Sequence, residues 1–324
     1  MNGNADIMYN PDQAVELRRL VIDNKKNEQF IQPKLHTIAV LSGKGGVGKS
    51  NLSCALAFAL ADFGKKVVLV DADLGLANLD IICGVRNARF NIAHLIDGSR
   101  TLSEILVHFR TSERASKLNG SVSLLPGGYG LKEIADLDDF AMERLFLELS
   151  SLEDLSDYLI MDAGAGIHKG ALAFAYASEL TLLVTTPEPT SIRDAYGVIK
   201  SLGSIPDAKL MLIVNMASSS REALDVAERI RLASMQFLGN APTYLGFVLK
   251  DDIVERSVKN CRIFYRDEPD ASASICVRNL AGELLRVLDG ENFNLQSVNS
   301  HSLKGIKSIF RAIISRIKKG EKNE

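Results

Sequence analysis

The sequence predicts an α/β fold, a doubly wound and mostly parallel sheet with helices on both faces. Short β-branched and aliphatic runs alternate with longer segments of helical periodicity, which is typical of successive βα units. These short runs are almost continuously hydrophobic, as expected of strands buried on both sides. The glycine-rich segment SGKGGVGKS at 42–50 separates the first such run from the first helical segment, where a ligand-binding turn is expected in this fold.

The individual elements follow from this alternation. Strands are predicted at 37–41, 66–71, 121–125, 158–162, 180–185, 209–215 and 244–249. Helices are predicted at 49–63, 137–150, 169–178, 191–203, 220–237 and 271–289. Gly64 is placed to end the first helix, and Thr101 with Glu104 predicts a capping box for another.

Composition limits the classes of protein that fit. The chain has 324 residues, 46% of them hydrophobic, which suits one large α/β domain with tails. A formal charge of −2 gives no overall basic field, so no direct sequence-specific DNA binding is expected. The four cysteines form no CxxC pair, which favours a reducing compartment and argues against a zinc or iron–sulfur site. No secretory signal or long apolar run is evident, so the chain is expected in the cytoplasm or peripherally attached to a membrane.

The segment at 42–50 carries the strongest functional signal. It satisfies the phosphate-loop pattern G-x-x-x-x-G-K-[ST] between a strand and a helix. Its glycines leave a bare concave backbone whose N–H groups can meet phosphate oxygens, and the following helix adds its positive dipole end. Lys49 is expected to reach the β- and γ-phosphates, and the Ser50 hydroxyl to bind Mg²⁺. The nucleotide-binding residues predicted here are Gly43, Lys44, Gly45, Gly46, Val47, Gly48, Lys49, Ser50 and Asn51.

Carboxylates follow two of the predicted strands. Asp71 and Asp73 end the second strand, and Asp162 ends the strand YLIMD. Ligands of doubly wound folds lie beyond the carboxyl ends of the strands, so these side chains are candidates for the site. Asp162 can hold Mg²⁺, commonly through a water, opposite Ser50. The alternative is that these aspartates only cap the turns that follow.

Lys44, directly after the first glycine, makes the string KGGVGKS, which resembles the deviant Walker A ATPases of the MinD/ParA family. The resemblance covers about residues 37–288 and implies a P-loop NTPase of the SIMIBI class with ATP and Mg²⁺. It also implies an ATP-dependent homodimer in which Lys44 reaches the phosphates of the facing subunit. Asp162 resembles the Walker B aspartate and Asp73 the catalytic aspartate that orients the attacking water, with Asp71 supporting the phosphate loop. Residues 163–166 resemble the switch that senses the γ-phosphate.

Further contacts are implied by the same resemblance. Asn215 stands where the family places an asparagine that reads the adenine; the alternative is a turn asparagine. Glu188, in TTPEPTSIRDAYGVIK, would approach the nucleotide across the dimer. Arg193 and Asp194 resemble a partner-docking surface, although a solvated charge pair explains them equally well.

Residues 302–319 predict an amphipathic basic helix, joined to the ATPase domain at 36–290 by a polar linker at 291–301. Such a helix can lie in the headgroup region of an anionic membrane, where each cation contributes about 1 kcal/mol. The chain is therefore expected at the inner face of the cell membrane when ATP-bound. The alternative is a helix docked on the domain's own core. The predicted membrane contacts are Leu303, Ile306, Phe310, Ile313 and Ile317 on the apolar side and Lys307 and Arg311 on the basic side.

The N-terminal extension at 1–35 carries a DQAxxLR string with Asp12, Gln13 and Ala14. This string resembles the N-terminal motif of the flagellar number regulators of the family, called FlhG or FleN. The resemblance implies the FlhF GTPase, flagellar switch-complex proteins and, in some relatives, a flagellar transcriptional activator as partners. The leading hypothesis is a membrane-associating ATPase switch, slow without an activating partner, that regulates flagellar number and placement.

Other functions remain open at this point. A division-site-selecting MinD-type ATPase would share the chemistry and differ in partners. A ParA-type DNA-segregation ATPase would bind duplex with steep salt dependence, whereas the apolar stripe beside the terminal cations favours lipid. Metal-cluster carriage by related ATPases is disfavoured by the missing CxxC. A nucleotide-binding scaffold without hydrolysis is the remaining alternative.

Overall fold

The computed structural model describes residues 35–73, 77–85, 88–128, 139–203 and 209–289. Within them lies one eight-stranded sheet in the order β3-β4-β2-β5-β1-β6-β7-β8. All neighbouring strands are parallel except β3 and β4, which confirms the predicted doubly wound α/β fold. The strands are β1 His36–Ser42, β2 Lys66–Ala72, β3 Val107–His108, β4 Ser121–Leu125, β5 Tyr158–Ala165, β6 Leu180–Thr185, β7 Lys209–Ala217 and β8 Thr243–Leu249.

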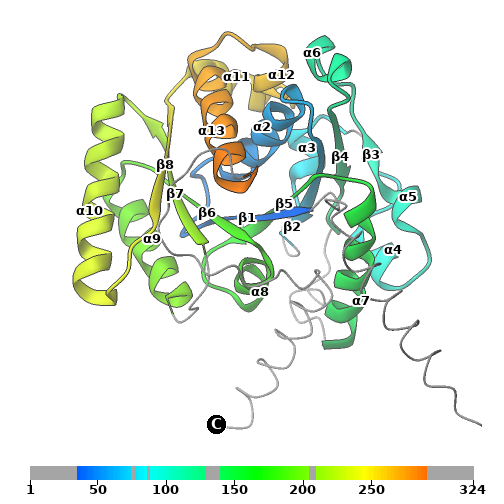
Figure 1. Ribbon diagram of the computed structural model, residues 1–324, viewed down its shortest axis with the longest axis horizontal. Helices are drawn as coiled ribbons and strands as arrows, with labels where there is room; N and C mark the ends of the chain where they lie inside the picture. Colours follow the sequence, from blue (N-terminus) through cyan, green and yellow to red (C-terminus); the bar gives the residue numbers. More distant parts are fainter. Residues whose placement is uncertain (1–34, 74–76, 86–87, 129–138, 204–208, 290–324) are drawn as a thin grey trace, which may run out of the picture. The chain divides into compact units, whose positions relative to one another are not determined.

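Helices cover both faces of this sheet (Figure 1). The longer ones are α2 Lys49–Asp62, α7 Asp139–Ser150, α8 Lys169–Ala177, α9 Pro189–Leu202, α10 Ser220–Leu238, α11 Asp252–Lys259 and α13 Ser272–Asp289. The short ones are α3 Leu79–Ile82, α4 Ile92–Ile96, α5 Leu102–Ile105, α6 Glu113–Lys117, α12 Phe264–Asp267 and the 3₁₀ turn η1 Ser151–Asp154.

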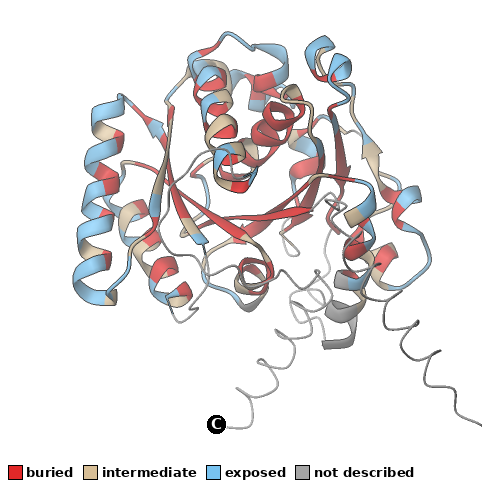
Figure 2. Cartoon of the chain, in the orientation of Figure 1, coloured by how far each residue is buried: buried red, intermediate tan, exposed pale blue. Residues whose placement is uncertain are grey.

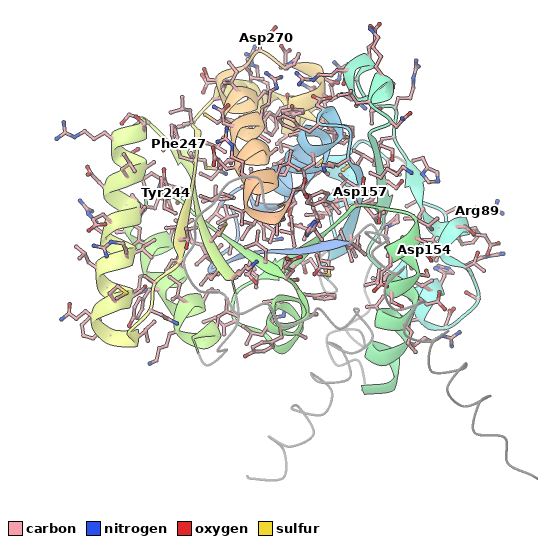
Figure 3. The ribbon with its side chains drawn as sticks, in the orientation of Figure 1. Arg89, Asp154, Asp157, Tyr244, Phe247 and Asp270 are labelled. Carbon is pink, nitrogen blue, oxygen red and sulfur yellow. The ribbon has the colours of Figure 1, made fainter. Side chains whose placement is uncertain are left out.

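The sheet separates two hydrophobic clusters, because successive side chains of a strand point to opposite faces. On β1, Ile38 and Val40 join the cluster formed with α2 and α13, while Ala39 and Leu41 join the cluster formed with α8 and α9. The central strands are buried along nearly their whole length (Figure 2). The edge strand β8 is less covered, and its Tyr244 and Phe247 are only half-buried. Figure 3 labels these two side chains on the strand.

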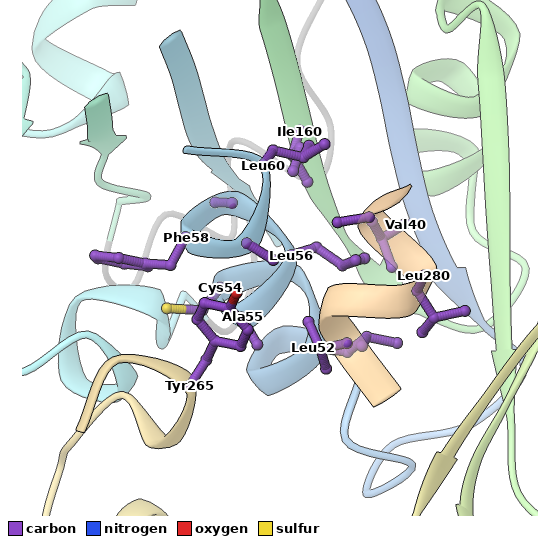
Figure 4. Close-up of a cluster of buried hydrophobic side chains, with 14 of the residues drawn as sticks. Val40, Leu52, Cys54, Ala55, Leu56, Phe58, Leu60, Ile160, Tyr265 and Leu280 are labelled. Atoms are coloured by element: carbon purple, nitrogen blue, oxygen red, sulfur yellow. The ribbon is translucent and has the colours of Figure 1, made fainter. Parts of the chain in front are cut away.

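Helix α2, which follows the glycine-rich loop, is buried on all sides. Alanines alternate with larger residues along it, so it fits between the sheet, α12 and α13 without an exposed face. Its Leu52, Leu56 and Leu60 lie among side chains of the sheet and of α13 (Figure 4). The helix ends at Asp62, and Gly64 has the left-handed φ of 84° that suits a helix end. This packing anchors the loop at the amino end of α2.

Most predicted elements are confirmed, with differences at their ends. The strand predicted at 158–162 continues to Ala165 because β5 resumes pairing with Ser42 beyond an irregularity in β1. The helix predicted from 191 begins at Pro189, since proline suits the first helical position. The predicted capping box is present, with the backbone N–H of Thr101 donating to Glu104 at 2.9 Å. The short β3, α3, α4, α6 and α12, as well as α11, were not predicted.

Two predicted functional segments lie outside the described residues. These are the N-terminal motif with Asp12, Gln13 and Ala14, and the helix at 302–319. Among the helices that the structure does describe, none combines the length and apolar character needed to cross a membrane.

Candidate nucleotide-binding site

The phosphate loop, residues 43–50, connects β1 to the buried helix α2. Gly46 and Gly48 both have a φ of 81°, the left-handed conformation that favours glycine. A Cβ on Gly45 or Gly46 would meet no atom within 4 Å, so the loop is open on this side. Lys49 and Ser50 begin α2, and Asn51 lies half-buried in its first turn. An open glycine backbone beside a helix amino end fits a phosphate group.

The other side of the loop is closed by neighbouring elements. A Cβ on Gly43 would stand 2.3 Å from the carbonyl carbon of Asp194, because the backbone of α9 passes directly against the loop. A Cβ on Gly48 would stand 2.4 Å from Nδ2 of Asn215. Close packing therefore requires glycine at 43, and both packing and the left-handed φ favour glycine at 48.

Lys49 and Asp162 form a buried ion pair beneath the loop. Their Nζ and Oδ1 atoms are 2.9 Å apart, and the side chains are 7% and 2% exposed. Ser53, one helical turn after Lys49, donates to the same carboxylate oxygen at 2.7 Å. Sequence reasoning missed Ser53, although its spacing of four from Lys49 places both on one helix face.

The two predicted magnesium ligands lie around the same ammonium group. Lys49 Nζ is 3.4 Å from the Ser50 hydroxyl and 2.9 Å from Asp162. A hydroxyl and a carboxylate fit Mg²⁺, which takes few protein oxygens and completes its shell with phosphates and water. Over the described residues, no group of three or more His, Cys, Asp or Glu could hold a metal ion, so a metal cage built from protein alone is absent there.

Asp71 lies on β2 directly opposite Asp162 on β5. Burial, together with the nearby charge of Asp162, raises the pKa of Asp71 to about 7 against the lowering effect of backbone hydrogen bonds. Its carboxylate accepts from the backbone N–H groups of Asn78 and Leu79, each at 2.9 Å, and of Asp73 at 3.3 Å. These contacts hold the segment that follows β2. Support of the phosphate loop by Asp71 stays a prediction.

Asp73 lies beside the switch segment, residues 163–166. A Cβ on Gly164 would be 3.2 Å from Oδ1 of Asp73 and 2.6 Å from Nε2 of His168. The carboxylate predicted to orient water is thus near the segment predicted to sense the γ-phosphate. His168 was not among the predicted site residues, since a single histidine carries no motif.

The second lysine of the loop has different partners. Lys44 Nζ forms an ion pair with Glu188 at 2.5 Å and a hydrogen bond with Thr190 at 3.1 Å. The side chains of Lys44 and Glu188 are 29% and 65% exposed. Both partners lie at the amino end of α9, so Lys44 points to the surface whereas Lys49 points inward.

Asn215 lies against the phosphate loop. Its Nδ2 donates to the backbone carbonyl of Val47 at 2.7 Å, and the residue is 8% exposed. An irregular pairing between Val214 and Ala217 of β7 lies at this position. One of the two amide N–H donors is therefore used by the loop, and reading of an adenine by Asn215 stays a prediction.

Arg193 and Asp194 lie on α9, beside Gly43. Their side chains pair with each other at 3.5 Å and are 81% and 28% exposed. They are adjacent to the phosphate loop through the backbone of Asp194, while the Arg193 side chain faces solvent. A role in docking a partner stays a prediction.

Comparison with known proteins extends these observations. Residues 38–264 match the family described as the CobQ/CobB/MinD/ParA nucleotide binding domain. The chain is 34% identical to the flagellum site-determining protein YlxH of Helicobacter pylori, over 90% of this chain and 92% of that protein. It is 35% identical to the antiactivator FleN of Pseudomonas aeruginosa, over 76% of this chain and 85% of that protein. A solved MinC:MinD cell division complex of Aquifex aeolicus contains a chain with a TM-score of 0.61 and 28% identity, covering 82% of this chain and all of that one.

Proposed function

This chain belongs to the CobQ/CobB/MinD/ParA family of nucleotide-binding domains, and from that premise we propose that it is an ATP-hydrolysing, dimerising switch that regulates flagellar number and placement. The observation that carries this proposal is that the two lysines of the phosphate loop point in different directions. Lys49 turns inward to Asp162, while Lys44 lies at the surface on Glu188. A surface lysine on a phosphate loop suits contact with a second molecule.

The residues of one chain have separate tasks in hydrolysis. The N–H groups of the phosphate loop bind the phosphates, and Lys49 leaves Asp162 to contact them. Ser50 and Asp162 hold Mg²⁺, which when bound neutralises charge on the phosphates. The Asp73 carboxylate accepts a hydrogen bond from water and orients it for in-line attack. Without an activating partner this reaction is slow.

Dimerisation depends on Lys44. Each ATP lies between two copies, and Lys44 of one contacts the phosphates of the other. To do so, Lys44 must leave Glu188. An exposed ion pair of this kind contributes only about 0 to 1 kcal/mol, so its loss is readily offset by contact with a phosphate. Glu188 then remains at the interface, near the nucleotide of the facing copy.

The biological role rests on the relatives. One is named a flagellum site-determining protein and another an antiactivator FleN. We therefore assign this switch to flagellar number and placement, with the FlhF GTPase, flagellar switch-complex proteins and a flagellar transcriptional activator as partners. Asp12, Gln13 and Ala14 would engage FlhF, and Arg193 with Asp194 would dock a partner on α9.

Membrane association would follow the nucleotide state. One amphipathic helix at 302–319 binds an anionic leaflet marginally, whereas a dimer presents two copies and makes the second insertion intramolecular. Hydrolysis would return the chain to a weakly attached cytoplasmic monomer.

Size exclusion with ATP and Mg²⁺ tests this proposal when vesicle binding is measured on the same samples. The wild-type chain should dimerise and bind anionic vesicles. Lys44→Ala should stay monomeric, and a chain ending at Ser300 should dimerise yet ignore lipid. Equal vesicle binding with ATP, ADP and no nucleotide would contradict the switch.

The flagellar role has its own test. Loss of the gene should change the number or position of flagella and leave division intact. Misplaced septa with normal flagella would favour the division-site alternative.

A further inference from the structure

The His168 side chain has a fixed hydrogen-bonding arrangement. His168 is the N-cap of α8, and its Nδ1 accepts a hydrogen bond from the backbone N–H of Ala171 at 3.2 Å. A backbone N–H only donates, so Nδ1 must present its lone pair. The neutral imidazole therefore carries its proton on Nε2. The cap of α8 thus determines which ring nitrogen is the donor.

This donor lies over the switch segment and beside Asp73. A Cβ on Gly164 would be 2.6 Å from His168 Nε2 and 3.2 Å from Asp73 Oδ1. Both polar atoms therefore lie on the side of Gly164 to which a Cβ would point, with room for at most one water molecule between them. A side chain at this position would collide with the His168 ring, so this approach requires glycine.

We propose that His168 is a positioning residue for hydrolysis, whose Nε2–H holds the Asp73 carboxylate in the orientation that orders the attacking water. The inference rests on the proposed function, in which Asp73 performs that task. Hydrogen bonds to a charged acceptor are about twice as strong as neutral ones, so such a bond, made directly or through one water, would orient a half-buried carboxylate. The hydrogen bond to Nδ1 fixes the ring to α8, so the position of the Nε2–H donor depends on the position of this helix, which follows the switch segment.

The competing explanation is that His168 only caps α8. Two substitutions distinguish this capping role from positioning of Asp73. Asparagine is among the best N-cap residues but is too short to place a donor where Nε2 lies. His168→Asn therefore keeps the cap and loses the donor. Glutamine caps poorly but can extend an amide N–H toward Asp73, so His168→Gln has the opposite properties.

The test measures phosphate release, affinity for a non-hydrolysable ATP analogue and thermal stability of the full chain. His168→Asn should lower kcat by at least about tenfold and leave KM, analogue affinity and Tm near wild type. His168→Gln should retain more of kcat than His168→Asn despite a lower Tm. His94→Asn is the matched control, because the His94 ring also caps a helix: its Nδ1 accepts from the backbone N–H of Asn91, the N-cap of α4, at 3.3 Å. It should keep the wild-type kcat.

A wild-type kcat in His168→Asn, with loss of activity only where the Tm falls, would overturn the inference and leave the proposed function intact. A wild-type chain that binds ATP and releases no phosphate would contradict both.

Discussion

At the residue scale, the site combines a buried cation with buried carboxylates on neighbouring strands. Lys49 neutralises Asp162, and Ser53 supplies a further hydrogen bond to it. Asp71 has no such cation among its recorded contacts and is stabilised by backbone N–H groups. Burial therefore has different consequences for the two aspartates. Asp162 is paired with a cation, and the pKa of Asp71 is raised to about 7.

The raised pKa of Asp71 predicts a pH dependence of stability. Between its ordinary pKa of 3.8 and about 7, the folded chain holds a proton that the unfolded chain releases. The contribution of Asp71 to the free energy of unfolding is thus full below 3.8, and it is lost as the pH rises through about 7. Urea unfolding of the wild type should show this decline from about pH 4 to pH 7, and Asp71→Asn should reduce it.

The comparison between the two chains cancels the other titrating groups, which they share. Parallel stability curves for wild type and Asp71→Asn over that range would contradict a raised Asp71 pKa.

At the element scale, one side of the phosphate loop packs against neighbouring elements and the other side faces open space. Helix α2 anchors it in the core, α9 closes against Gly43, and Asn215 on β7 closes against Gly48. Gly45 and Gly46 face open space. Glycines in one loop therefore serve two different requirements, packing of the protein and access of a ligand.

This difference predicts that alanine will lower stability at position 43 and ATP affinity at position 45. Gly43→Ala should destabilise the chain by about 1 to 3 kcal/mol, since its Cβ would overlap the backbone of α9. Gly45→Ala has room for its Cβ and should change stability by less than about 0.5 kcal/mol. It should weaken ATP binding instead, because the added methyl group lies on the side that receives phosphate.

Chemical denaturation and ATP titration of both variants check this assignment. Equal losses of stability at the two positions would contradict it.

The elements and the site differ in how far the sequence could predict them. The strands and longer helices follow from local periodicity, and the loop follows from a motif with a physical requirement at each glycine. The contact of Asn215 with Val47 depends on strand order, since β7 lies two strands from β1 in the sheet. The partners of Asp71 depend on where the chain turns after β2. The two-residue β3 and the four-residue α3 and α12 are too short to show periodicity.

At the scale of the whole molecule, the account requires two copies to complete one site. Within the described residues, Lys49 lies beside Ser50 and Asp162, and Asp73 lies near Gly164 of the switch segment. Lys44 lies at the surface with Glu188. Under the proposed function, this arrangement would couple nucleotide binding to dimerisation, and through the terminal helix to the membrane.

The most direct test of this claim mixes two inactive variants, Lys44→Ala and Asp73→Ala, and measures phosphate release per mixed dimer. If Lys44 acts on the facing copy, one site of the mixed dimer has both residues, so activity should return toward one working site per dimer. Tagged copies pulled down with ATP and Mg²⁺ establish that mixed dimers form. Mixed dimers that form and release no phosphate would contradict the account, because Lys44 would then act within its own chain.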